Sequence, residues 1–136
     1  MLYLAYGSNL NLGQMRQRCP RAEALYSATL DNYRLVFRGV ADLIRDEGSV
    51  CEVGLFNITA QCEEALDLYE GFPHLYGKQI IEMGGEDVMT YTMNTGKLSP
   101  PSDVYYNSIF EGYEDFGLNP YYLDAARASS FIHCAR

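Results

Sequence analysis

The sequence has no tryptophan, only two histidines and no Cys-x-x-Cys pair. Zinc sites are usually built from closely spaced cysteines and histidines, and here these residues are scattered along the chain. They are Cys19, Cys51, Cys62, Cys134, His74 and His133. We therefore expect no metal site. Free cysteine is among the most buried residue types, so we expect all four thiols to pack in the core.

Positive charge is also scarce. There are 10 Lys and Arg residues against 18 Asp and Glu, which gives a formal net charge of −8. A protein with this balance repels nucleic acids and anionic membranes. No apolar run approaches the length of a transmembrane helix, and no secretory leader precedes the first predicted strand. We expect a cytoplasmic protein with reduced thiols and with neither a nucleic-acid nor a membrane partner.

The 136 residues, 48% of them hydrophobic, are enough for one domain spanning residues 1–136. Residues rich in Leu, Tyr, Val and Ile predict strands, which are expected at 2–6, 23–37 (two strands, broken at Asp31-Asn32), 39–44, 50–57, 76–83 and 88–94. Capping residues and three- to four-residue apolar spacing predict helices, which are expected at 11–18, 60–70, 105–116 and 120–131. Six or more strands around one central helix indicate an α+β fold with a small, closed or strongly curved sheet flanked by helices.

The first strand runs directly into Gly7-Ser8-Asn9-Leu10. A strand that breaks at glycine into small polar residues leaves backbone N–H groups free to bind an anion. The same sequence is also typical of an ordinary turn. From these residues alone, both interpretations remain open.

Glu70 differs in its setting from the other acidic residues. It lies between Tyr69 and Gly71-Phe72-Pro73, at the predicted end of a helix. A carboxylate packed among aromatic rings is desolvated, which raises its pKa toward the value that a general base or acid needs. The alternative is a solvated carboxylate on the last helical turn. A helix C-terminus disfavours negative charge, so this position is mildly unfavourable unless function or a partner compensates.

Three segments together resemble the γ-glutamylcyclotransferase family: residues 2–10 (LYLAYGSNL), 39–44 (GVADLI) and 66–71 (LDLYEG) followed by Tyr76. Their order and spacing match as well. Residues 91–105, which include Pro100-Pro101-Ser102, resemble the glutathione-cycle branch of that family. The resemblance covers nearly the whole chain.

The resemblance implies a small β-barrel with helices packed around it. It also implies an enzyme that cyclises a γ-glutamyl group to 5-oxoproline and releases the attached amine, with no metal or organic cofactor. The α-amine of the substrate is the nucleophile, so no side-chain nucleophile is needed. Glu70 matches the catalytic glutamate of the family. The substrate-binding residues implied by the match are Tyr3, Tyr6, Gly7, Ser8, Asn9, Leu10, Tyr76 and Tyr105.

Several alternatives stay open at this point. The turn at residues 7–9 binds the α-carboxylate, the developing oxyanion or both. A γ-glutamyl amino acid is the first choice of substrate, and a γ-glutamyl amine or a γ-glutamyl biosynthetic intermediate is the other. A non-catalytic small-ligand or protein-interaction domain on the same fold is the alternative from a different class. Relatives with this fold can be homodimers, so a homodimer is also possible.

Overall fold

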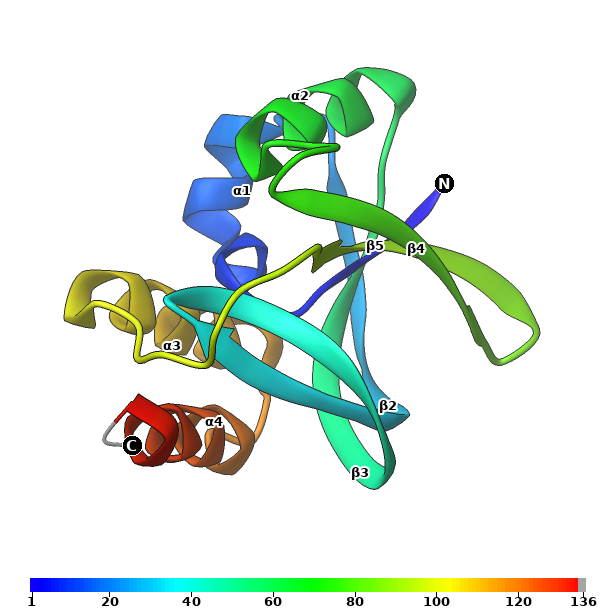
Figure 1. Cartoon of the computed structure of the whole chain (residues 1–136). Helices are drawn as coiled ribbons and strands as arrows, with labels where there is room; N and C mark the ends of the chain where they lie inside the picture. Colours follow the sequence, from blue (N-terminus) through cyan, green and yellow to red (C-terminus); the bar gives the residue numbers. More distant parts are fainter. Residues whose placement is uncertain (135–136) are drawn as a thin grey trace.

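The computed structural model describes residues 1–134, with side chains as far as Ile132, so the side chains of His133 and Cys134 lie outside the described part. Figure 1 shows one curved sheet with the helices gathered in two groups beside it. The strands are β1 (Leu2–Ala5), β2 (Glu23–Arg38), β3 (Val40–Asn57), β4 (Tyr76–Met83) and β5 (Glu86–Met93). The helices are the short 3₁₀ helix η1 (Ser8–Leu10), α1 (Leu12–Arg18), α2 (Ala60–Glu70), α3 (Asp103–Phe116) and α4 (Tyr121–Cys134).

The sheet has the order β2-β3-β1-β5-β4. The central strand β1 is antiparallel to β3 and parallel to β5. The sheet is open, with β2 and β4 at its two edges. The predicted α+β fold is confirmed. Of the two predicted sheet forms, the strongly curved one is present, and the sheet does not close into the β-barrel that the resemblance implied.

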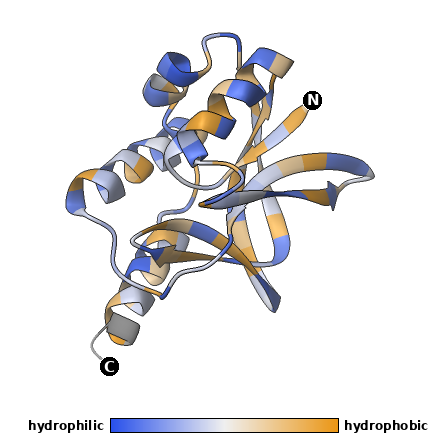
Figure 2. Ribbon diagram, turned by 45° about the horizontal axis from the view of Figure 1, so that its top comes forward, coloured by the Kyte–Doolittle hydropathy of each residue, from blue (hydrophilic) through white to orange (hydrophobic). Residues whose placement is uncertain are grey.

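The described residues form five strands, and the prediction of six or more is wrong. The expected hairpin between residues 39–44 and 50–57 does not form, because residues 40–44 and 50–57 both belong to β3 and pair with β2. The chain reverses at Gly39, whose φ of 79° suits a glycine. Hydropathy varies from residue to residue along both strands (Figure 2).

The break expected at Asp31-Asn32 is a bulge inside β2. Asp31 pairs with Val50 and Tyr33 with Arg45, so residues 46–49 bow out opposite Asn32. Asn32 has a left-handed backbone (φ 66°), and its side-chain oxygen accepts a hydrogen bond from the N–H of Gly48 at 3.1 Å. The side chain holds the two strands together across the irregularity, which is why they continue as one bent hairpin.

Local capping signals are confirmed. Asn11 caps α1 by accepting from the N–H of Gln14, and Thr59 caps α2 by accepting from the N–H of Cys62. Gly71 ends α2 in a left-handed conformation, with φ 65°. Helix α3 begins two residues earlier than expected, after a cap by Ser102, and α4 covers 121–134 in place of 120–131.

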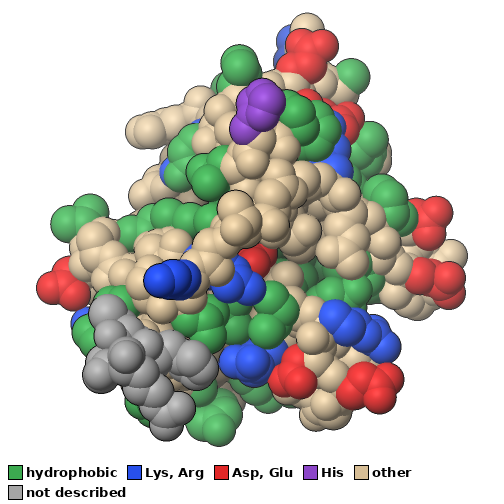
Figure 3. All heavy atoms as spheres, in the orientation of Figure 1, with side chains coloured by type: hydrophobic (Ala, Val, Ile, Leu, Met, Phe, Trp, Pro, Cys, Tyr) green, Lys and Arg blue, Asp and Glu red, His purple; other side chains and the backbone are tan. Residues whose placement is uncertain are grey.

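The core lies between the sheet and the helices. Cys19, Cys51 and Cys62 are buried there as free thiols, as predicted. Among residues 1–134, no helix is long and apolar enough to cross a membrane. On the face shown in Figure 3, acidic side chains lie mostly near the rim, and hydrophobic and uncharged surface occupies much of the middle.

Candidate active site

A cavity of about 240 Å³ lies where the end of β1 meets the end of α2. It has room for several water molecules or for one small polar molecule. Its lining is Tyr3, Tyr6, Gly7, Ser8, Asn9, Val40, Ala41, Tyr69, Glu70, Leu75, Tyr76, Tyr91 and Tyr105. The structure thus brings Glu70 and all of the predicted binding residues except Leu10 to one cavity.

The turn after β1 carries two residues that line this cavity, Ser8 and Asn9. Within η1, the N–H of Leu10 donates to the carbonyl of Gly7 at 3.0 Å, and the N–H of Asn11 donates to that of Ser8 at 3.1 Å. The N–H groups of Ser8 and Asn9 lie before the first bonded N–H of this turn. They donate to no backbone carbonyl among residues 1–134. They are therefore candidate donors to a bound molecule.

Leu10 has a structural role in the core. It is fully buried, and its side chain packs against Gly54. A Cβ on Gly112 would lie 2.6 Å from the carbonyl carbon of Leu10, so α3 can approach η1 this closely only with a glycine there. The backbone N–H of Leu10 is already used inside the turn. Leu10 anchors the turn to α3 and does not line the cavity.

Glu70 is half-buried at the last residue of α2. The Nδ2 of Asn9 lies 3.2 Å from its Oε1 and also donates to the hydroxyl of Tyr3 at 2.8 Å. Burial raises the pKa of Glu70 to about 7, although the charge of Arg18 and the hydrogen bond from Asn9 act in the opposite direction. A carboxyl with this pKa can take up and give back a proton near neutral pH.

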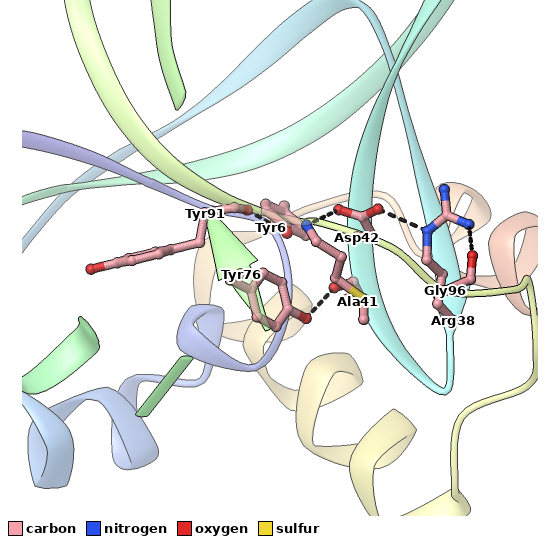
Figure 4. A network of polar contacts seen from close by, with 8 residues as sticks. Tyr6, Arg38, Ala41, Asp42, Tyr76, Tyr91 and Gly96 are labelled. Atoms are coloured by element: carbon pink, nitrogen blue, oxygen red, sulfur yellow. Dashed lines mark hydrogen bonds and ion pairs between the residues drawn. The ribbon is translucent and has the colours of Figure 1, made fainter. Parts of the chain in front are cut away.

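One residue of β3 orients two tyrosines. The hydroxyl of Tyr76 donates to the carbonyl of Ala41 at 2.6 Å (Figure 4), and the N–H of Ala41 donates to the hydroxyl of Tyr105 at 3.0 Å. Because the proton of Tyr76 is engaged, its oxygen can only accept from a ligand. Tyr105 already accepts from the protein, so its own proton is free to be donated. Burial raises the pKa of both phenols well above the ordinary value, which keeps them neutral.

The same distinction applies to the two tyrosines of the first strand and turn. Tyr6 donates to the carbonyl of Tyr91 at 2.6 Å (Figure 4), which leaves its oxygen as an acceptor. Tyr3 accepts from Asn9, which leaves its proton available. The cavity thus has hydrogen-bond acceptors at Tyr6 and Tyr76, and hydrogen-bond donors at Tyr3 and Tyr105.

A buried ion pair fixes the strand that carries Ala41. Asp42 is only 2% exposed and accepts from the Nε of Arg38 at 2.9 Å and from the N–H of Met93 at 2.8 Å. Arg38 also donates to the carbonyl of Gly96 at 2.6 Å (Figure 4). Since Met93 belongs to β5, these contacts join β3 to a strand that it does not neighbour in the sheet.

Sequence reasoning missed several lining residues, among them Tyr69 and Tyr91, and it missed Arg18 behind the lining. Cations in the last turn of a helix are common because they complement the helix dipole, so Arg18 carried no distinguishing signal. Tyr69 adjoins Glu70, and that adjacency was the one local sign of its position. Contacts between α1, η1 and α2 bring these residues together, and such contacts cannot be inferred from local sequence.

A family profile and several solved structures match this chain. The profile of a family described as "Gamma-glutamyl cyclotransferase, AIG2-like" matches residues 3–108. A solved structure named γ-glutamyl cyclotransferase is 23% identical, with a TM-score of 0.81 over 94% of this chain and 86% of the other. A Homo sapiens structure described as uncharacterized protein loc79017 is 24% identical, with a TM-score of 0.81 over 93% and 86%.

A third solved structure, YkqA from Bacillus subtilis, is 22% identical with a TM-score of 0.76, covering 96% of this chain and 54% of its own. At these identities the structures establish a shared fold. No curated protein matches the chain significantly in sequence.

Proposed function

Because the chain belongs to the γ-glutamyl cyclotransferase, AIG2-like family, we propose that it converts the γ-glutamyl group of a small substrate to 5-oxoproline and releases the attached amine. One observation carries the proposal. A half-buried carboxyl with a pKa of about 7, that of Glu70, shares a cavity with the unpaired N–H groups of Ser8 and Asn9. A base and a set of oxyanion donors are what this cyclisation requires.

The reaction needs one proton to move twice. The α-ammonium of the substrate transfers a proton to the ionised Glu70, and the free amine then attacks the γ-carbonyl carbon. A C–N bond forms to close the five-membered ring, and a tetrahedral intermediate with a negative oxygen results. When the C–N bond to the leaving amine breaks, Glu70 returns the proton to that nitrogen. The ring nitrogen still carries two protons after the attack and releases one of them to solvent as the lactam forms, and the departed amine is protonated in solution. One carboxyl therefore acts first as base and then as acid.

The polarity of the cavity favours one orientation of the substrate. The ammonium group is a donor and pairs with Glu70 and with the acceptor oxygens of Tyr6 and Tyr76. The γ-carbonyl and the α-carboxylate are acceptors, and they pair with the N–H groups of Ser8 and Asn9 and with the proton of Tyr105. A preorganised donor at the developing oxyanion is worth about 3 kcal/mol in comparable acyl chemistry. Holding the amine near the carbonyl contributes further, by fixing a flexible chain.

The leaving amine lies toward the exposed edge of the cavity. Tyr69 and Leu75 line the cavity and are 46% and 50% exposed, so this side is open to solvent. A γ-glutamyl amino acid is the first candidate substrate, and a γ-glutamyl amine is the second.

A substrate panel tests the proposal. The protein is incubated with γ-glutamyl amino acids, γ-glutamyl amines and larger γ-glutamyl conjugates, and 5-oxoproline is measured by chromatography. Product from at least one class is expected, and it identifies the leaving group. If no γ-glutamyl compound yields 5-oxoproline, the proposed activity is wrong and a ligand-binding role on the same fold is favoured.

A further inference from the structure

Arg18, in the last turn of α1, makes four side-chain hydrogen bonds just behind the cavity. One guanidinium nitrogen donates to the Oδ1 of Asn9 at 2.6 Å and to the Oγ of Ser8 at 3.3 Å. The other donates to the Oε1 of Gln14 at 2.6 Å and to the hydroxyl of Tyr69 at 2.7 Å. The guanidinium carbon also lies 3.7 Å from the centre of the Tyr69 ring. Arg18 thus joins the turn after β1 to the end of α2.

The bond to Asn9 determines which way the Asn9 amide points. Because the oxygen of Asn9 faces Arg18, its nitrogen faces the opposite way, and this nitrogen donates to Glu70 and to Tyr3. Without Arg18, the amide could rotate and present its oxygen to Glu70, which would repel the ionised carboxylate. The planar guanidinium suits this task, since it bonds to both Asn9 and Tyr69 from a rigid fork.

Charge acts in the same direction as this geometry. Glu70 is approached by the phenols of Tyr3, Tyr6, Tyr76 and Tyr105, from β1, the following turn, β4 and α3. Burial keeps these phenols neutral near pH 7. Among the side chains that the structure describes, which end at Ile132, Arg18 is the cation whose charge acts on Glu70, and it lowers the pKa of that carboxyl against the effect of burial.

We propose that Arg18 is a positioning residue, which orients the Asn9 amide toward Glu70 and stabilises the ionised form of that carboxylate. The proposal deepens the proposed cyclotransferase activity and rests on it. Arg18 does not line the cavity, so it acts through Asn9 and Glu70 and has no direct contact with the substrate. Its loss is expected to alter kcat and its pH dependence more than KM.

Three variants separate charge from orientation. R18Q removes the charge and keeps an amide donor, whereas R18K keeps the charge and loses the fork. R16Q is the matched control, because Arg16 is exposed on the same helix, two residues away. Activity is measured as kcat and KM from pH 5 to 9. The carbon-13 shift of the Glu70 carboxyl is titrated by NMR in the same proteins, and thermal melts check that each variant folds.

In R18Q we expect the acidic limb of the kcat profile and the Glu70 titration to move up together, by about 1 unit. At pH 7 that shift reduces the ionised fraction, and hence kcat, by about fivefold, with recovery at pH 9. In R18K we expect the acidic limb of the kcat profile to stay at the pH of the unaltered protein, with a lower kcat. R16Q should change neither the position of the limb nor kcat. A Glu70 titration that is the same in R18Q and in the unaltered protein would overturn the proposal. The titration needs no substrate, so it tests Arg18 even if the cyclotransferase activity is absent.

Discussion

Asn9 and Glu70 are separated by 61 positions in the chain, yet the Nδ2 of Asn9 lies 3.2 Å from the Oε1 of Glu70. This contact joins the turn after β1 to the C-terminal end of α2. Burial favours the neutral form of Glu70, whereas the charge of Arg18 and the amide hydrogen bond favour the ionised form. The balance leaves the pKa of Glu70 at about 7, where both forms are populated at neutral pH. The pairing therefore suits a carboxyl that must accept a proton and then return it.

Replacing Glu70 with glutamine is the most direct test of that role. E70Q preserves the shape of the side chain and its place beside Asn9 but cannot accept a proton. We expect kcat for 5-oxoproline formation to fall by at least about 100-fold, in the range of a lost general base, with a smaller change in KM. E64Q is the matched control, because Glu64 is exposed on the same helix; it is expected to keep full activity. A fully active E70Q would show that Glu70 is not the base.

Sequence reasoning succeeded where structure depends on neighbouring residues. The caps at Asn11 and Thr59 and the helix end at Gly71 are local features, and each formed as predicted. The hairpin between β4 and β5 was also predictable, because Gly84 and Gly85 supply the positive φ angles of its turn. Glu70 was singled out because its aromatic neighbours are adjacent in sequence and because it matches the catalytic glutamate of the family that the sequence resembles. Its catalytic role stays a prediction.

Features that depend on distant contacts could not be predicted. The sequence at Asp31-Asn32 is typical of a chain reversal, but the hydrogen bond from Gly48 to the Asn32 side chain keeps β2 continuous. Leu10 belongs to the motif segment, yet it packs against α3 and not in the cavity. Gly112 has no side chain, and this allows the close approach. The role of Arg18 depends on α1 packing near η1 and α2. Each of these results from tertiary packing that overrides the local pattern.

The raised pKa of Glu70 predicts a cost in stability at high pH. The pKa rises from 4.5 in the unfolded chain to about 7 in the folded protein, so between these values the folded state binds more protons. Stability from this group is complete below about pH 4.5 and is lost as the pH rises through 7. We expect E70Q to exceed the unaltered protein by about 1–3 kcal/mol in free energy of unfolding at pH 8, after allowance for partial exposure.

Urea denaturation at pH 5 and pH 8 measures this difference. The advantage of E70Q should shrink markedly at pH 5, where the folded Glu70 is already protonated. E64Q should follow the unaltered protein at both pH values. An advantage of E70Q that is equal at pH 5 and pH 8 would contradict the assigned titration.

Tyr105 and Tyr76 should differ in how they bind an anion. Tyr105 has a free proton to donate, whereas the proton of Tyr76 is held by the carbonyl of Ala41 at 2.6 Å. The product 5-oxoproline carries a carboxylate, and hydrogen bonds to ionised groups are about twice as strong as neutral ones. We expect Y105F to weaken 5-oxoproline binding by about tenfold or more and Y76F to weaken it less. Calorimetric titration of both variants measures this, and the reverse order would refute the assigned polarity.

Gly112 is expected to support the site from outside it. A Cβ at this position would lie 2.6 Å from the carbonyl carbon of Leu10 and 2.7 Å from the backbone nitrogen of Asn11. Neither is the flexible end of a side chain, so η1 would have to move away from α3. Alanine gains about 1 kcal/mol in helix propensity over glycine, but overpacking of this kind costs about 1–3 kcal/mol.

We therefore expect G112A to have a lower Tm and to lose activity, because η1 carries Ser8 and Asn9. G13A is the matched control. Gly13 also lies in a helix, but there a Cβ would meet only the side-chain oxygen of Asn11, at 3.3 Å. G13A should keep its activity and have an equal or higher Tm, because the helix propensity gained by alanine is not opposed by a backbone clash. If G112A melted at the temperature of G13A and remained fully active, the position of η1 would not depend on α3, and the packing of Leu10 could not be what holds the donors of Ser8 and Asn9 at the cavity.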